Sequence, residues 1–428
     1  MHDLKLVREH PEVLREAMRR RAAHAVGPLL DRAEALDRER RTLIASVEEK
    51  KAERNASSQE VARRKRAGES ADDLIARGRS LGEEIAALDA RRTAAEAELE
   101  ALLLEVPNVT LPDVPEGSEE HNVVLRQWGT PRDTGDGLRP HWEIGEALGL
   151  FDLERGAKVS GSGFVVYRRQ GARLVRALMN YFLDTHAAEH DYEEVWAPAV
   201  VNRASMTGTG QLPKFEDDAY GLAGDDLFLI PTAEVPVTNL YRDEILDAAQ
   251  LPMGFAAYTP CFRREAGSAG KDTRGIQRVH QFDKVELVRY ATPEDSAAQL
   301  EVLTSHAETL LQRLGLPYQV KLLAAGDTGF SSAKTYDLEV FAPGVGKWLE
   351  VSSCSVFTDF QARRANIRYR PAAGEKPRFV HTLNGSGLAF PRVIAAILEH
   401  YQQPDGTVPL PAPLHRYFGD DALRPAAR

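Results

Sequence analysis

The clearest pattern in the chain is a heptad repeat of apolar residues near its N-terminus. An apolar side chain recurs every seventh position at Leu74, Leu81, Leu88, Ala95 and Leu102. Ile85 and Leu99 lie four residues after two of these positions and complete an a/d seam. An earlier stripe of Leu29, Leu36 and Leu43 has the same period. The pattern predicts two long helices, one over residues 28–65 and one that ends near residue 105.

The segment RAGESADD, residues 66–73, separates the two stripes and predicts a turn. Gly68 is a helix breaker, and Ser70 or Asp72 is suited to cap the second helix. The simplest structure is an antiparallel helical hairpin. Its first helix would be about 55 Å long, so we expect the hairpin to project as an arm. The periodicity by itself fits an intermolecular coiled coil or a dimerisation arm equally well.

The pattern changes after the hairpin. Residues 106–118, VPNVTLPDVPEGS, hold three prolines and a glycine and are typical of a linker. Helix-like and strand-like segments then mix, such as the amphipathic helix of residues 177–190 and the strand of residues 192–201. Pro198 makes that strand an edge or interface strand. We therefore divide the chain into residues 1–105, 106–118 and 119–428, and the proline-rich tail after Tyr401 suggests no function.

Composition adds few constraints. The chain has 428 residues, of which 43% are hydrophobic and 28% charged, as in a globular protein of two or three domains. No apolar run predicts a membrane span, and the N-terminus lacks the features of a signal peptide. The two cysteines, Cys261 and Cys354, are too few for a zinc cluster and give no sign of an oxidising compartment. We expect a cytoplasmic protein that is not bound to a membrane.

The distribution of charge is more informative than the total of −10. Residues 1–105 hold 21 Lys and Arg against 22 Asp and Glu, a balance of −1, so the remainder carries −9. Within the first part, one basic cluster lies beside the predicted turn: Arg63, Arg64, Lys65 and Arg66. A contact with nucleic-acid phosphates is expected at this tip and not on the acidic body.

Residues 258–290 carry the most chemical information. A strand-like run reaches Arg263 and Glu265, and a second run returns after a loop that contains Lys271, Asp272, Thr273 and Arg274. In strand geometry one face of the second run would carry Arg278, His280, Phe282, Lys284 and Glu286. Arginines bind phosphate, a ring stacks on a base and a carboxylate accepts from an amine, so the set suits a nucleotide. No P-loop or GxGxxG signature occurs, which leaves side chains on strands to hold it.

Three further strings carry candidate side chains. PTAEVPVTNLY contains Thr232 and Glu234, although Thr232 by itself reads as an ordinary helix cap. In WLEVSSCSVFTDFQARR, Glu350 and Ser353 would lie on opposite faces of a regular strand, and a bulge would bring both oxygens to one magnesium ion. In HTLNGSGLAFPRVIAAILEHYQ, Pro391 suits the first residue of a helix, whose N-terminus attracts anions.

Taken together, these strings resemble the class II aminoacyl-tRNA synthetases, in the form found in bacterial-type seryl-tRNA synthetases. FRREAGSAGKDTRG followed by HQFDKVEL resembles motif 2, the string around Pro198 resembles motif 1, and HTLNGSGLAFPR resembles motif 3. The N-terminal part resembles the tRNA-binding arm. The resemblance covers residues 1 to about 402. It implies an α+β fold with a helical hairpin, an antiparallel sheet flanked by helices, and a homodimer formed at motif 1.

The resemblance also implies an activity: L-serine and ATP form seryl-adenylate, and the seryl group passes to tRNA(Ser), with tRNA(Sec) as a further candidate. Serine binding is assigned to Thr232, Glu234, Arg263, Glu286 and Ser386. ATP binding is assigned to Arg263, Glu265, Arg278, Phe282, Glu350, Ser353 and Arg392. Of these, Glu350 and Ser353 would also hold Mg²⁺, and Arg263 and Arg392 would be catalytic. The arm tip, Arg63, Arg64, Lys65 and Arg66, would bind tRNA.

One position departs from the family pattern, because Val356 follows SSCS where the family usually has Asn. This departure puts a local hydrogen bond in doubt but not the metal ligands. The main alternative is an inactive or repurposed homologue that binds tRNA without aminoacylation, whose mark would be lost motif arginines or carboxylates. A second alternative is a ligase that charges a carrier protein, which would lack the arm.

Overall fold

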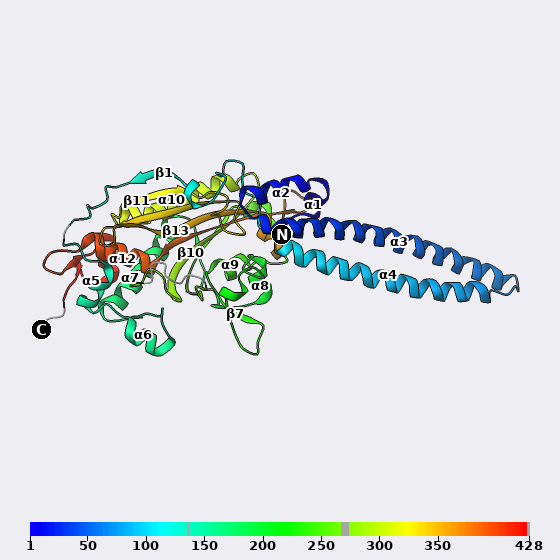
Figure 1. Cartoon of the computed structure of the whole chain (residues 1–428), viewed down its shortest axis with the longest axis horizontal. Coiled ribbons are helices and arrows are strands. Elements are labelled where there is room, and N and C mark those ends of the chain that lie inside the picture. Colours follow the sequence, from blue (N-terminus) through cyan, green and yellow to red (C-terminus); the bar gives the residue numbers. More distant parts are fainter. Residues whose placement is uncertain (136, 267–273, 426–428) are drawn as a thin grey trace. The chain divides into compact units, whose positions relative to one another are not determined.

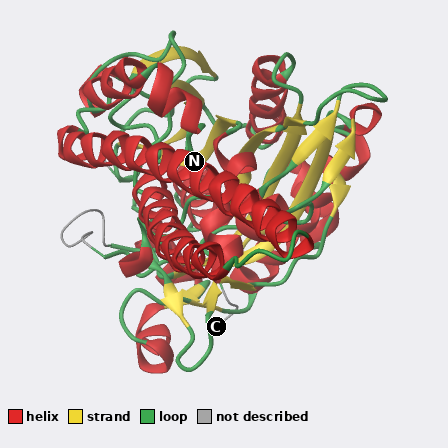
Figure 2. Cartoon of the chain, turned by 90° about the vertical axis from the view of Figure 1, so that its right-hand side faces the viewer, coloured by secondary structure: helices red, strands yellow, loops and turns green. Residues whose placement is uncertain are grey.

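The computed structural model describes residues 1–135, 137–266 and 274–425 (Figures 1 and 2). The chain divides into two compact units, Met1–Arg19 with Ala23–Pro107, and Arg20–Ala22 with Asn108–Arg428. Lys271, Asp272 and Thr273, which we expected in a loop between two strands, lie outside the described residues. Within the described ranges, no helix is long and apolar enough to cross a membrane.

Two long antiparallel helices form most of the first unit and confirm the predicted hairpin (Figure 1). They are α3 (Gly27–Arg66, blue) and α4 (Asp72–Leu104, cyan), preceded along the chain by α1 (Leu4–Glu9) and α2 (Pro11–Arg20). In α4, Leu81, Ile85, Ala95 and Leu99 are buried as the heptad pattern predicts, whereas Leu103 is buried in place of the expected Leu102, and Leu74 and Leu88 are half-buried. In α3, Leu30 is buried in place of the expected Leu29, followed by Leu36 and Leu43.

The hairpin differs from the sequence prediction at its turn, and it also buries a carboxylate. Gly68 has a φ of +74°, as its role of breaker requires. The N-cap of α4 is Ala71, not Ser70 or Asp72, and Ser70 Oγ accepts the Asp72 amide from outside the helix (3.5 Å). Asp37 of α3 is buried, and Arg8 of α1 donates two hydrogen bonds to its carboxylate, each 3.1 Å long.

The second unit is built on an eight-stranded sheet of order β1-β11-β12-β13-β16-β10-β9-β4. All neighbouring strands are antiparallel except β4, which runs parallel to β9. The strands are β1 (Val123–Trp128), β4 (Glu193–Glu194), β9 (Met253–Phe262), β10 (Gln281–Ala291), β11 (Tyr318–Leu322), β12 (Lys334–Ala342), β13 (Lys347–Thr358) and β16 (His381–Ala389). The flanking helices complete the predicted α+β fold, which is confirmed.

Shorter elements surround this sheet. The helices are α5 (His141–Leu148), α6 (Leu153–Ser160), α7 (Gln170–Glu189), α8 (Arg203–Gly208), α9 (Glu234–Thr238), α10 (Ser296–Arg313), α11 (Phe360–Ala365), α12 (Phe390–Tyr401) and α13 (His415–Phe418). Small sheets pair β2 (Phe151–Asp152) with β3 (Val166–Tyr167), and β17 (Val408–Pro409) with β18 (Ala422–Leu423). The strand predicted at 192–201 is split into β4 and β5 (Val200–Asn202), with Pro198 between them. Its edge position is confirmed, because β4 is the last strand of the large sheet.

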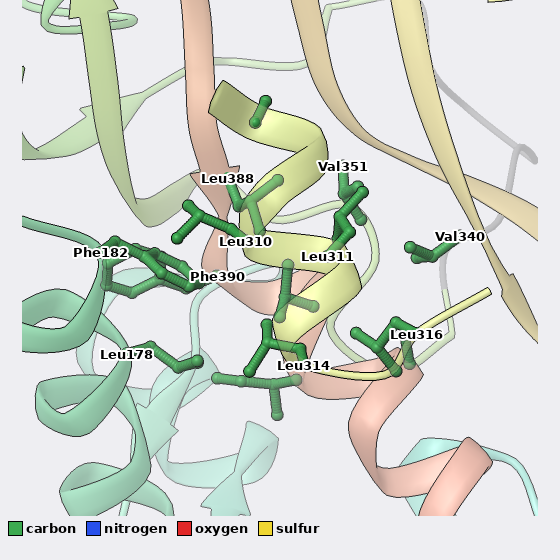
Figure 3. Close-up of a cluster of buried hydrophobic side chains, with 14 of the residues drawn as sticks. Leu178, Phe182, Leu310, Leu311, Leu314, Leu316, Val340, Val351, Leu388 and Phe390 are labelled. Atoms are coloured by element: carbon green, nitrogen blue, oxygen red, sulfur yellow. The ribbon is translucent and has the colours of Figure 1, made fainter. Parts of the chain in front are cut away.

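One face of the large sheet packs against α7, α10 and α12 (Figure 3). Phe182 from α7, Leu310 from α10 and Phe390 from α12 meet sheet residues such as Val340 and Val351 in this cluster. The segment after Tyr401, which the sequence left without an assignment, joins the same cluster through Leu414 and Phe418. The apolar side chains on this face leave the opposite face free to carry polar groups.

A buried carboxylate ties α12 to the rest of the second unit. Glu399 is fully buried and accepts from the backbone N of His141 (2.9 Å), from His141 Nδ1 (2.7 Å) and from the backbone N of Val345 (3.0 Å). On its other side, His141 Nε2 accepts the backbone N–H of Ile276 (3.3 Å). Gly275 permits this approach, because it has a φ of +73° and a Cβ there would lie 2.2 Å from His141 Nε2. These bonds hold residues 274–280 against the helix that carries Arg392.

We predict that Glu399→Ala lowers the free energy of unfolding by about 3 kcal/mol or more, because three buried donors lose their acceptor. Urea unfolding followed by circular dichroism measures this loss. Glu146→Ala, at an exposed position on α5, is the matched control and should change the free energy by no more than about 0.5 kcal/mol. Equal stability of the two variants would contradict the role of Glu399.

Candidate active site

A cavity of about 390 Å³ opens on the polar face of the sheet. All five residues predicted to bind serine line it: Thr232, Glu234, Arg263, Glu286 and Ser386. Strand alternation separates this face from the apolar one, because Ser353 and Ser355 of β13 line the cavity while Cys354 and Val356 belong to the hydrophobic cluster. Val356, the departure from the family pattern, is 1% exposed and therefore points away from the cavity.

Two carboxylates are buried side by side in the wall of this cavity. Glu234, at the start of α9, is 6% exposed, and Glu286, on β10, is 1% exposed. The side-chain amide of Asn384 on β16 donates to both, at 3.0 Å to Glu234 and 2.8 Å to Glu286. Lys284 forms an ion pair with Glu286. Burial and the nearby charge of Glu286 raise the pKa of Glu234 to about 7, so the pair favours a cation.

A smaller cavity of about 60 Å³ adjoins the first. Six of the residues predicted to bind ATP line it: Arg263, Glu265, Arg278, Phe282, Glu350 and Arg392. The Arg263 guanidinium lies 5.3 Å from the centre of the Phe282 ring, and Arg278 donates to the Glu265 carboxylate at 2.7 Å. Arg263, Lys284, Glu350 and Ser386 border both cavities, which makes the two spaces one composite site.

The prediction that one strand face carries residues 278–286 is wrong at its beginning. β10 begins at Gln281, so Arg278 and His280 precede the strand in a segment that Gly275 helps to turn. Arg278 still reaches the smaller cavity. His280 does not line either cavity: it stacks on Phe164, with ring centres 5.4 Å apart, and Nδ1 lies 3.0 Å from the Arg263 carbonyl oxygen.

A bulge on β13 brings Glu350 and Ser353 to one cavity, as the metal hypothesis required. Leu338 of β12 pairs with Ser352 and Glu339 with Glu350, so Val351 is the extra residue, and its side chain enters the apolar cluster (Figure 3). Glu350 also contacts Arg392 of α12, at 3.4 Å between Oε2 and Nη1. In the described part of the chain, no three His, Cys, Asp or Glu side chains could hold a metal ion together. A magnesium ion here would therefore need oxygens from a substrate.

The third string forms a strand and a helix. Ser386, which its NGSG context makes look like a turn residue, lies on the central strand β16. Gly385 is required by close packing, since a Cβ there would be 2.2 Å from Leu303 Cδ2. α12 begins at Phe390, so Pro391 is its second residue and Arg392 its third, still within the first turn.

Sequence reasoning missed two residues of the site. Asn384 bridges the two buried carboxylates, and its signal was hidden in NGSG, which resembles a turn. Gln361 on α11 is fully buried and donates to Glu234 at 2.6 Å. No sequence pattern distinguishes Gln361 from a surface glutamine, because only the approach of α11 to α9 creates its environment.

The basic cluster of the first unit occupies the last turn of α3. Glu60 pairs with Arg63 at 2.7 Å and with Arg64 at 3.2 Å, and Asp73 also pairs with Arg64 at 3.2 Å. Lys65 and Arg66 are exposed. The excess of positive charge at this tip is therefore smaller than the four residues suggest, and Lys65 and Arg66 contribute most of it.

The chain is similar to known proteins over its whole length. Residues 1–110 match the Seryl-tRNA synthetase N-terminal domain and residues 214–401 the tRNA synthetase class II core domain (G, H, P, S and T). A serine–tRNA ligase of Gemmatimonas aurantiaca is 68% identical over 99% of this chain and 100% of its own length. A second, from Geobacillus kaustophilus, is 57% identical with the same coverage.

A solved structure agrees with these relatives. The seryl-tRNA synthetase from Pyrococcus horikoshii, complexed with ATP, matches with a TM-score of 0.94 and 38% identity over 100% of both chains. The similarities support the ligase interpretation and not the inactive homologue. The chain belongs to the seryl-tRNA synthetase family of the class II aminoacyl-tRNA synthetases.

Proposed function

We propose that the composite site carries out both steps of serine–tRNA ligation. The carboxylate of L-serine attacks the α-phosphate of ATP, which forms seryl-adenylate and releases pyrophosphate. A hydroxyl at the 3′ end of tRNA(Ser) then attacks the seryl carbonyl carbon and AMP leaves, with tRNA(Sec) as a further candidate acceptor. The observation that carries the proposal is the pair of adjoining cavities, one lined by every serine candidate and the other by most ATP candidates, with Arg263 between them.

The larger cavity suits serine in charge. The buried carboxylates of Glu234 and Glu286 attract the ammonium group, and Thr232 adds a hydroxyl acceptor beside them. Ser386 borders both cavities and is the candidate contact of the serine hydroxyl. Arg263 then has the serine carboxylate on one side and the α-phosphate on the other. This arrangement holds the two reacting groups together, which lowers the barrier by positioning.

The side chains that line the smaller cavity suit the groups of ATP. Phe282 would stack on the adenine, and Glu265 would accept from its amine or contact a nearby group of ATP. Arg392, in the first turn of α12, would bind the γ-phosphate, with Arg278 as a further cation. Phosphoryl chemistry of this type depends on charge neutralisation more than on an acid–base pair, which explains why guanidinium groups dominate the site.

Glu350 and Ser353 would hold Mg²⁺. Their oxygen atoms face the same cavity and are of the type that magnesium prefers, and phosphate oxygens would complete the coordination. When bound, the ion would neutralise charge on the phosphates. Both steps are proposed to take place in the cytoplasm, where free cysteines such as Cys261 and Cys354 stay reduced, and cell fractionation would test this location.

Serine should support ATP–pyrophosphate exchange, whereas alanine should be about 10⁴-fold less effective in kcat/KM. A site built to bind a hydroxyl leaves its own polar groups unpaired when that hydroxyl is missing. Threonine should be excluded by its extra methyl group. Exchange with alanine at a rate close to that with serine would refute the proposed substrate.

ATP–pyrophosphate exchange also distinguishes a role of an arginine in phosphate binding from an effect of surface charge. Arg392→Ala should slow exchange by about 10²-fold. Arg416→Ala, which removes an exposed arginine on α13, is the matched control and should leave the rate unchanged. A normal rate for Arg392→Ala would remove that residue from the ATP site.

We further propose that residues 1–105 bind tRNA, that residues 106–118 act as a linker and that residues 119–428 form the catalytic domain. The basic tip supports this division, because the rest of the chain is acidic. The tip binds phosphates through Arg63, Arg64, Lys65 and Arg66. Its acidic partners Glu60 and Asp73 weaken the first two, so Lys65 and Arg66 should dominate.

Replacing Lys65 and Arg66 together by serine should weaken tRNA binding and reduce the slope of log Kd against log salt by about 1 to 2, because fewer counterions are released. Filter binding at several salt concentrations measures both effects. The double variant Arg370→Ser and Lys376→Ser has the same charge change outside the arm and should keep the slope. Serine-dependent exchange should be normal in both. An unchanged slope in the tip variant would exclude these two residues as phosphate contacts.

We also propose a homodimer formed through residues 192–201. The segment contains β4, the last strand of the large sheet, and it exposes Trp196 (74%) and Val200 (39%) close together in the sequence. Sedimentation velocity should show a dimer for the unmodified chain and a shift to monomer for Trp196→Glu. Val159→Glu, at a 77% exposed position on α6, should stay dimeric. A monomeric unmodified chain would disprove the proposal.

A further inference from the structure

We propose that Gln361 is a positioning residue for amino-acid selection, which holds the Glu234 carboxylate in place and ionised at the wall of the larger cavity. The inference deepens the proposed function and rests on it. Gln361 lies on α11 and is fully buried, and it is not among the residues that line either cavity. Any effect of Gln361 on serine must therefore pass through its partners; Glu234 and Thr209 are the two of them that line the larger cavity, and Glu234 is the charged one.

The orientation of the Gln361 amide is determined by its partners. Its Nε2 donates to Glu234 Oε1 at 2.6 Å and to the Thr209 carbonyl oxygen at 3.2 Å. Its Oε1 accepts from the hydroxyl of Thr382, a fully buried residue of β16, at 2.7 Å. A flipped amide would direct its oxygen at two acceptors, the Glu234 carboxylate and the Thr209 carbonyl. The observed orientation is therefore the one that directs a donor at Glu234.

Several charged groups face Glu234. Glu286 and Lys284 approach from β10, and Arg263 approaches from the end of β9. Burial is the largest effect that raises the pKa of Glu234 and the charge of Glu286 is the second, while the Gln361 hydrogen bond is the largest effect that lowers it. Lys284 and Arg263 lower it further. The result is a pKa of about 7, so the loss of one donor changes the ionised fraction at neutral pH.

The ionised fraction of Glu234 matters for serine binding because a protonated Glu234 is neutral and attracts an ammonium group weakly. A lower ionised fraction raises the KM for serine and leaves ATP binding unchanged, since the side-chain hydrogen bonds of Gln361 go to Glu234, Thr209 and Thr382, none of which is an ATP candidate. The pKa of Glu234 is raised above its ordinary value, so the charged form is lost as the pH falls through about 7. Removing the Gln361 donor should move this loss to higher pH.

The test is Gln361→Met, which keeps the length of the side chain and removes the donor. Serine-dependent pyrophosphate exchange is measured from about pH 6 to about pH 8.5, with KM for serine and for ATP at each pH. At pH 7 the variant should raise the KM for serine about tenfold, as expected for a lost hydrogen bond to a charged group, and the excess should shrink as the pH rises. KM for ATP should stay within about twofold.

Further variants separate positioning from a purely structural role. Thr382→Val, which removes the hydroxyl that anchors the amide oxygen, should give a smaller shift in the same direction, and Thr382→Ser, which keeps the hydroxyl, should restore the profile of the unmodified chain. Gln299→Met replaces another buried glutamine, on α10, and should leave the profile unchanged. If circular dichroism shows that Gln361→Met does not fold, the two Thr382 variants decide by the same criteria.

An equal rise in the KM for serine at every pH, or a fall in kcat with that KM unchanged, would overturn the role of Gln361. The proposed function is judged separately in the unmodified chain. If that chain shows no serine-dependent exchange, the function itself fails, and the inference that rests on it fails too. If exchange is normal and the variant profile does not move, only the inference fails.

Discussion

The burial of two neighbouring carboxylates is the constraint on which the rest of the second unit depends. Removing Glu234 and Glu286 from water costs several kcal/mol for each charge unless partners compensate. Asn384 donates to both, Gln361 donates to Glu234 and Lys284 pairs with Glu286. These partners come from α11, β16 and β10, so three separate elements must converge before the two charges are tolerated.

The sheet provides that convergence. β10 pairs with β16 in a register that sets Glu286 opposite Ser386 and Val288 opposite Asn384, so the Asn384 amide can reach across to the carboxylates. The apolar cluster behind the sheet and the bonds of Glu399 hold α12 in position. A site held in this way is preorganised, because its polar groups need little movement when a charged substrate arrives.

The β13 bulge also places polar side chains at the site and apolar ones in the core. Glu350 and Ser353 would be on opposite faces of a regular strand, and the extra residue Val351 brings both oxygens to the cavity while its own side chain packs into the core. Glu350 then shares a cavity with Ser353 and contacts Arg392, in a position to interact with a metal ion or with the phosphates. One inserted residue thus serves packing and chemistry together.

The sequence by itself determined the features that depend on local periodicity and on short strings. The heptad spacing of Leu81, Ile85 and Leu99 predicts the hairpin because a helix repeats its faces within a few residues. The candidate residues of the site also came from the sequence, since the motif strings that carry them resemble those of a known family.

Tertiary structure alone decided which polar groups became buried partners. Nothing in the sequence marks Asp37 as buried, and only the approach of Arg8 from α1 provides its partner, while Asn384 looked like part of a turn until β16 placed it between two carboxylates. Gln361 has no local signal, because its role exists only where α11 approaches Glu234. Buried polar contacts join residues far apart in the chain, and their energy depends on desolvation that no local pattern encodes.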